Sequence, residues 1–123
     1  MSNQRSLHFV DPEELKSIEL MPGVTAKVLS GFNREKMMMV LATIDPGVLV
    51  PAHSHPHEQV GIVYSGSASF RIGDEERVVV EKDMYCIPAD VEHEATAIGD
   101  EPFMAFEIFF PVRDDFVEKA KQP

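Results

Sequence analysis

Turn-forming residues recur about every ten positions along most of this chain, and they separate short runs of apolar residues. Asp45-Pro46-Gly47 is the clearest of these breaks, because aspartate, proline and glycine all favour tight turns. Short runs between regular breaks are typical of an all-β sandwich or barrel. The predicted strands are 24–30, 36–44, 48–52, 58–64, 68–72, 77–80, 84–87, 94–98 and 103–110.

The two ends of the chain carry helical signals. Residues 114–121 have aspartates near their start and lysines in their last turn, which predicts a short C-terminal helix. Asp11-Pro12-Glu13-Glu14 has the pattern of a capped helix start. The following segment, 15–20, fits a helix or a strand equally well. Cys86, between Tyr85 and Ile87, is predicted to be a small residue of the core.

Length and charge limit the functions that this chain can have. Its 123 residues fit one domain, and its single cysteine excludes an internal disulfide framework. A formal net charge of −10 argues against a nucleic-acid partner, which needs a basic surface. Neither a signal peptide nor an apolar run of membrane-spanning length is visible, so we expect a cytoplasmic protein with no membrane partner.

Histidines are concentrated in one segment. His53, His55 and His57 lie within residues 47–66, and His93 follows later. Imidazole is the commonest protein ligand of divalent transition metals. On an extended strand, an H-x-H pair points both rings to the same face, because strand side chains alternate. The pattern therefore predicts a metal site.

The spacing of this segment matches the first sequence motif of the cupin family, G-x5-H-x-H-x3-E-x6-G. The corresponding residues are Gly47, His53, His55, Gln59 and Gly66, with glutamine in place of the motif's glutamate.

The second cupin motif, G-x5-P-x-G-x2-H-x3-N, is matched in spacing further along the chain. Its positions fall on Lys82, Pro88, Asp90, His93 and Ala97, so the proline and histidine are kept while three other positions differ. The chain thus resembles a small cupin consisting of one domain, 1–123, with its barrel at about 24–110. The resemblance implies an all-β double-stranded β-helix, or jelly-roll barrel, with a short C-terminal helix.

The cupin resemblance also implies a metal ligand set. Carried over position by position, the ligands are His53, His55, Gln59 and His93, around one divalent ion of Fe, Mn, Ni, Zn or Cu. Glu58 is the rival to Gln59, and His57 is left at the rim. The plainer alternative is an empty cupin whose histidines only form hydrogen bonds within the barrel.

One charged residue interrupts the last apolar run. If Glu107 faces the barrel interior, apolar surroundings raise the pKa of its carboxyl group, which suits acid–base chemistry. The alternative is that Glu107 points to solvent or forms an ion pair with Arg113. Periodicity alone does not choose between the two.

The sequence is also similar to KdgF-like cupins, which ketonise unsaturated uronates from pectin and alginate. That subgroup has a D-x-F-x-x-x-R pattern on the last strand, which corresponds here to Glu107, Phe109 and Arg113. The resemblance implies that Glu107 transfers a proton, that Phe109 contacts the substrate, and that Arg113 holds the uronate carboxylate. Glutamate replaces the subgroup's aspartate, and a displacement of about 1 Å can change a rate about 100-fold.

Two other functions remain open at this stage. One is a cupin dioxygenase, which consumes O₂ at a redox metal. The other is a non-catalytic cupin that binds a sugar or metabolite without turnover. Small cupins commonly dimerise through their sheet edges, so we expect a homodimer that acts on a small molecule.

Overall fold

The computed structural model describes residues 8–32 and 34–122, which form two antiparallel sheets, a short 3₁₀ turn and one α-helix. The elements in chain order are η1 (Pro12–Glu14), β1 (Ile18–Met21), β2 (Val24–Val28), β3 (Met38–Ile44), β4 (Leu49–His53), β5 (Glu58–Ser65), β6 (Ser67–Ile72), β7 (Glu75–Val79), β8 (Met84–Ile87), β9 (His93–Ile98), β10 (Phe103–Phe110) and α1 (Asp114–Lys121).

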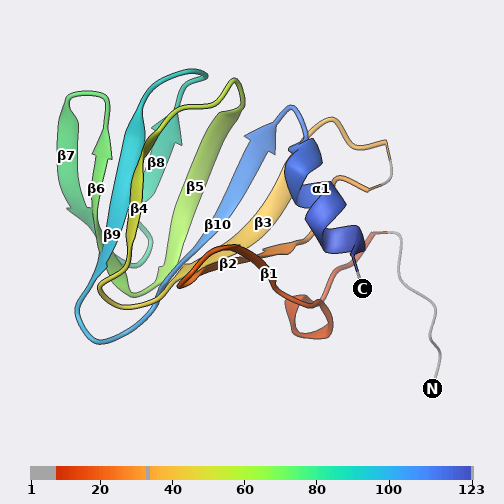
Figure 1. The fold of residues 1–123 in the computed structure, drawn as a ribbon, viewed down its shortest axis with the longest axis horizontal. Helices are drawn as coiled ribbons and strands as arrows, with labels where there is room; N and C mark the ends of the chain where they lie inside the picture. Colours follow the sequence, from red (N-terminus) through yellow and green to blue (C-terminus); the bar gives the residue numbers. More distant parts are fainter. Residues whose placement is uncertain (1–7, 33, 123) are drawn as a thin grey trace.

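The predicted all-β architecture is confirmed. One sheet has the strand order β1-β2-β3-β10-β5-β8 and the other β4-β9-β6-β7, and the chain crosses repeatedly between them, as in a jelly roll. Figure 1 shows the two sheets as the walls of one open barrel, with α1 beside β1 and β2. Each predicted strand and the C-terminal helix are present, and the undecided segment after η1 contains strand β1.

The inward faces of the two sheets make the main core. Along β10 the burial alternates, so that Phe103, Ala105, Glu107 and Phe109 point inward while their neighbours are more exposed. A second cluster lies under α1, whose Phe116 packs with residues of β2 and β3. Within residues 8–32 and 34–122, no helix is long and apolar enough to cross a membrane.

The prediction for Cys86 was wrong. Along β8 the pattern is strictly alternating, so Tyr85 and Ile87 are buried and Cys86 is exposed. Successive side chains of a strand point to opposite faces of the sheet, and only one face of β8 is covered. Cys86 therefore cannot share the buried face with Tyr85 and Ile87.

Two residues of the second motif adopt the backbone conformation that glycine favours. Lys82 has φ +76° and Asp90 has φ +67°, and both stand where the cupin motif has glycine. The motif's turns are therefore preserved although the glycines are not. A side chain with a Cβ is strained in this region, and aspartate tolerates it better than lysine.

Lys82→Gly is therefore expected to stabilise the protein. Removing the Cβ relieves left-handed strain of about 1–2 kcal/mol, and the added freedom of the unfolded chain offsets part of this, which leaves a gain of about 0.5–1 kcal/mol. The measurement is the free energy of unfolding in urea. Lys82→Ala is the control, because it keeps the Cβ. An equal gain in both variants would contradict the explanation.

Candidate functional site

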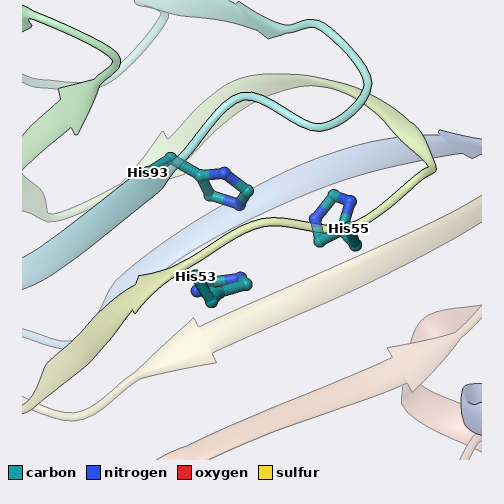
Figure 2. A group of neighbouring side chains, drawn as sticks. All are labelled: His53, His55 and His93. Carbon is teal, nitrogen blue, oxygen red and sulfur yellow. The ribbon is translucent and has the colours of Figure 1, made fainter.

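Three histidines meet between the two sheets. His53 ends β4 and His93 begins β9, and the two residues are direct partners across these antiparallel strands. His55 lies beyond the end of β4, so the expectation that a strand carries the whole H-x-H pair was wrong for this residue. Its ring nevertheless joins the others, as Figure 2 shows. One ring nitrogen from each of the three lies within 4.8 Å of the others, close enough to hold one metal ion.

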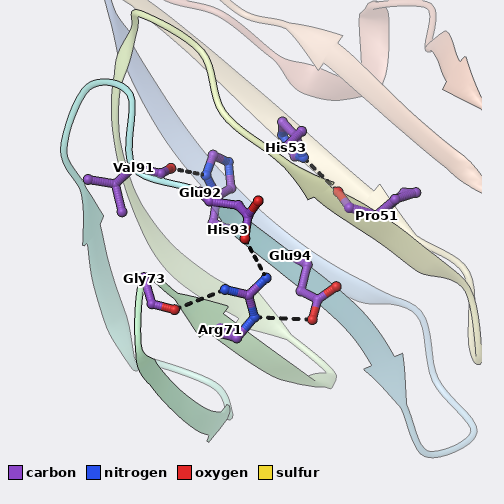
Figure 3. Close-up of polar contacts among 8 residues, drawn as sticks. All are labelled: Pro51, His53, Arg71, Gly73, Val91, Glu92, His93 and Glu94. Atoms are coloured by element: carbon purple, nitrogen blue, oxygen red, sulfur yellow. Dashed lines mark hydrogen bonds and ion pairs between the residues drawn. The ribbon is translucent and has the colours of Figure 1, made fainter.

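Backbone carbonyl groups orient the three rings. In each histidine the Nδ1 atom is hydrogen-bonded to a nearby carbonyl oxygen, which can only accept, so Nδ1 carries the hydrogen. The carbonyl groups belong to Pro51, His57 and Val91, at 2.8, 2.9 and 2.9 Å from Nδ1 of His53, His55 and His93 respectively. Figure 3 shows the first and last of these contacts. In a neutral imidazole this leaves the lone pair on Nε2, the atom that binds metals.

Burial favours the neutral form of two of these rings. Desolvation lowers the pKa of His93 to about 4, and it also lowers the pKa of His55, with Arg113 adding to the effect. The Nε2 atom of His93 is buried and has no hydrogen-bond partner among the described residues. An unpaired buried nitrogen is unfavourable unless a ligand meets it. This donor set therefore fits a divalent transition metal.

Gln59 completes the cluster from the other sheet. Its side chain is 6% exposed, and its Oε1 atom lies 3.0 Å from Nε2 of His55. Because the Nε2 atom of neutral His55 has a lone pair, this contact brings two electron donors together. A distance of 3.0 Å is ordinary for an N–H···O hydrogen bond, but Nε2 of His55 has no hydrogen to donate when Nδ1 carries it. Both the imidazole lone pair and the amide oxygen would then be available to one cation.

The two other candidates near this position lie outside the cluster. Glu58 is exposed, because it points to the opposite face of β5 from Gln59. His57 orients His55 through its backbone carbonyl group, while its own ring is not one of the three whose nitrogens gather within 4.8 Å.

Glu107 points into the barrel, toward this cluster. Its side chain is 8% exposed, and its Oε2 atom accepts hydrogen bonds from Nε2 of Gln59 at 2.8 Å and from the Tyr85 hydroxyl at 2.5 Å. Burial raises the pKa of the Glu107 carboxyl group, although these two hydrogen bonds oppose the increase. The alternative of an ion pair with Arg113 is not what the structure shows.

Tyr85 was not identified from the sequence as a site residue. It lies on β8, two strands away from Glu107 on β10, and Gly61 of β5 is the direct partner of both. A Cβ atom on Gly61 would be 2.5 Å from Cζ of Tyr85, so only glycine lets the phenol cross the strand. Burial raises the pKa of Tyr85 well above its usual value, and the phenol stays a hydrogen-bond donor. Only strand register could have identified this contact.

Phe109 and Arg113 lie beside the histidines, toward α1. The Phe109 ring is 5.9 Å from the ring of His55, and the Arg113 guanidinium stacks 4.0 Å from the centroid of Phe116 and 5.1 Å from that of Phe109. Two nitrogens of Arg113 also contact the carboxylate of Asp115, at 2.9 and 3.3 Å. Aromatic packing and this ion pair together hold the guanidinium group in place.

A small cavity joins these groups. Its volume is about 110 Å³, and its lining includes His53, Gln59, His93, Glu107 and Arg113. The volume is below the roughly 300–1,000 Å³ of drug-sized ligand sites, so the cavity favours a small ligand. It brings together the four predicted groups of residues: imidazoles, amide, carboxyl and guanidinium.

A charged cluster covers the opposite face of the strand that carries His93. Arg71 on β6 contacts Glu94 at 3.2 Å and Glu92 at 3.1 Å, and it donates to the carbonyl oxygen of Gly73 (Figure 3). These contacts tie the start of β9 to β6. Arg71 and Glu92 are not among the residues that line the cavity, whereas Glu94 is one of them.

Comparisons with known proteins agree with this architecture. A family model described as a cupin domain matches residues 40–109. The comparison with curated proteins gives no match.

Solved structures match over most of the chain. KdgF from Halomonas sp. is 25% identical with a TM-score of 0.81, and the alignment covers 90% of this chain and 99% of that one. An RmlC-like cupin from Shewanella frigidimarina is 28% identical with a TM-score of 0.79, over 90% and 96%. AerE from Microcystis aeruginosa is 26% identical with a TM-score of 0.70, over 80% of this chain and 46% of AerE.

Proposed function

Because the chain belongs to the cupin family, we propose that it is a metal-dependent cupin that converts a small unsaturated sugar acid into its linear ketone. The substrate class is a 4,5-unsaturated monouronate from pectin or alginate. The observation that carries the proposal is the buried Glu107 carboxyl group in the same cavity as the histidine cluster. The structural similarity to KdgF supports it further.

The metal would be held by His53, His55, Gln59 and His93. Three of these supply imidazole Nε2 lone pairs, and Gln59 supplies a neutral carbonyl oxygen. A bound divalent cation polarises the sugar oxygens that it contacts.

The proposed conversion rearranges bonds without adding atoms. The substrate's C4=C5 double bond carries the ring oxygen on C5, so loss of the C1 hydroxyl proton and cleavage of the bond between C1 and the ring oxygen leave an aldehyde and an enolate. Protonation of the enolate at C4 then gives the ketone at C5. The step therefore needs a group that takes a proton from the C1 hydroxyl and one that delivers a proton to C4. Glu107 does both in this proposal, because its carboxyl group is buried beside the cluster and has a raised pKa.

Phe109 and Arg113 would bind the substrate. The Phe109 ring provides an apolar wall between His55 and Arg113. The contacts of Arg113 with Asp115 use Nε and Nη2. Its forked donors suit the uronate carboxylate, and the negative charge of Asp115 competes with that ligand.

The direct test is turnover of a 4,5-unsaturated monouronate by the purified, metal-loaded protein, followed by nuclear magnetic resonance in air and under argon. The proposal expects equal rates in both atmospheres. Strict dependence on O₂ would favour a dioxygenase. Saturable binding of the uronate without faster conversion would favour the non-catalytic binding protein. The predicted homodimer and cytoplasmic location stay predictions, which sedimentation and cell fractionation can check.

Arg113→Lys is expected to raise KM by about tenfold with little change in kcat. A point charge replaces a two-donor fork, and one hydrogen bond to a charged group is worth about 1.5 kcal/mol. The measurement is steady-state kinetics on the uronate. Asp115→Asn is the matched control, because it removes the competing negative charge but keeps an oxygen that accepts from Arg113, so KM should be no higher than in the parent. An unchanged KM in Arg113→Lys would remove Arg113 from substrate binding.

A further inference from the structure

The amide group of Gln59 bridges two different partners. Its Oε1 atom lies 3.0 Å from Nε2 of His55, and its Nε2 atom donates to Oε2 of Glu107 at 2.8 Å. We propose that Glu107 is a positioning residue for the metal centre: by accepting this N–H, it turns the carbonyl oxygen of Gln59 toward the histidine cluster and so makes Gln59 a ligand. The inference rests on the metal site proposed above.

The proposed role of Glu107 depends on the orientation of the Gln59 amide, which has an acceptor oxygen on one side and a donor NH₂ group on the other. An amide side chain can turn over, which exchanges its oxygen and its NH₂ group. In the other orientation, the NH₂ group of Gln59 would face the histidines, and it has no lone pair for a cation. Its oxygen would then meet Oε2 of Glu107, so that two acceptors are in contact. Glu107 therefore favours the orientation that presents oxygen to the histidine cluster.

Tyr85 strengthens this preference. Its hydroxyl group donates to the same Oε2 atom that accepts from Gln59, so this oxygen acts as an acceptor in both contacts. Gly61 leaves room for the phenol to reach it. Tyr85 thus holds the carboxyl group in the position that Gln59 requires, and the three side chains form one connected unit between β5, β8 and β10.

The same contact explains why this chain has glutamine where the cupin motif has glutamate. A glutamate at position 59 would present a carboxyl oxygen, with no N–H, to Oε2 of Glu107. The identities of the two residues are therefore linked: two ionised carboxylates would share no hydrogen, so an amide at one position suits a carboxylate at the other. Three imidazoles and one amide carry no charge, so the Glu107 carboxyl group is also the acidic group next to the ligand set.

The first test exchanges the two side chains and measures thermal stability after treatment with chelator. Gln59→Glu alone is expected to lower Tm by about 5 °C or more. It removes a buried hydrogen bond and places a carboxyl oxygen of residue 59 against Oε2 of Glu107, so that two acceptors are in contact. The exchange variant Gln59→Glu/Glu107→Gln restores an amide–carboxylate pair and should recover at least half of that loss. An exchange variant that is as unstable as the sum of the single variants would overturn the linkage.

The second test measures Co²⁺ affinity by titration of the chelator-treated protein, followed by visible absorption. Glu107→Leu removes the acceptor for the amide and should weaken Co²⁺ binding by about 10–100-fold, as loss of a partner behind a ligand does. In a Gln59→Ala background, the same Glu107→Leu change should have little further effect. An equal loss in both backgrounds would show that Glu107 acts independently of Gln59, and no loss in either would show that it does not act on the metal.

These measurements are independent of the proposed reaction. A protein that passes both tests but does not convert uronates would refute the proposed function and leave the inference intact. A protein that converts uronates but shows no coupling between Gln59 and Glu107 would support the proposed function and refute this inference. A parent protein that binds no Co²⁺ would overturn the proposed metal site and this inference together.

Discussion

Purified His93→Ala protein is expected to carry almost no divalent transition metal, whereas the parent carries about one ion per chain. His93 supplies a buried Nε2 atom with no other partner among the described residues, and it lies directly across from His53. Loss of a partner behind a metal ligand weakens binding by about 10–100-fold, so loss of a direct ligand should exceed that range. Metal analysis after purification and a competitive titration measure the effect.

His57→Ala is the matched control for this prediction. It removes a neighbouring imidazole that is not part of the group formed by His53, His55 and His93, and it keeps the backbone carbonyl group that orients His55. Its metal content should equal that of the parent. Gln59→Ala should fall between the two variants, because an amide oxygen is a weaker donor than imidazole. If His93→Ala retained the metal of the parent, the ligand set drawn from the second motif would be wrong.

Glu107→Gln is expected to lower turnover of a 4,5-unsaturated monouronate by about 10²–10⁴-fold, the range that general acid–base groups contribute. Glutamine has nearly the same shape as glutamate, and it can still accept from Gln59, so the fold and the bound metal should remain. It cannot carry a proton to carbon. The loss should be equal under argon and in air, because the proposed reaction uses no oxygen.

Three measurements make this prediction specific. Metal content and Tm, determined on the same preparation as the rate, show whether the centre and the fold are intact. Glu118→Gln on α1 is the control, since it removes an exposed carboxylate that is not among the residues lining the cavity. Full activity in Glu107→Gln would exclude this carboxylate from the mechanism, whatever the substrate is.

Strand positions could be predicted from the sequence because the signals for turns are local. Asp45-Pro46-Gly47 ends β3, and a glycine with φ +57° lies in the predicted hairpin between β6 and β7. Motif spacing likewise identified the three histidines, since the fold brings the two motifs together wherever their register is kept. Even the substituted glycine positions, Lys82 and Asp90, preserve the turn conformation.

The environment of Glu107 could not be predicted in this way. Alternation along β10 groups Glu107 with Ala105 and Phe109, but it does not say whether that face is covered by the other sheet. The same ambiguity led to the wrong prediction for Cys86, whose neighbours Tyr85 and Ile87 occupy the covered face of β8.

The contacts between strands were decided by tertiary structure alone. Tyr85 reaches Glu107 only because β8, β5 and β10 are adjacent in a register that places Gly61 between them. His55 joins the cluster from a loop, held by a carbonyl group rather than by strand geometry. Sequence by itself determined which residue types lie on a common face and which turns connect them. The pairing of strands, which depends on packing between residues distant in the chain, determined which of those residues touch.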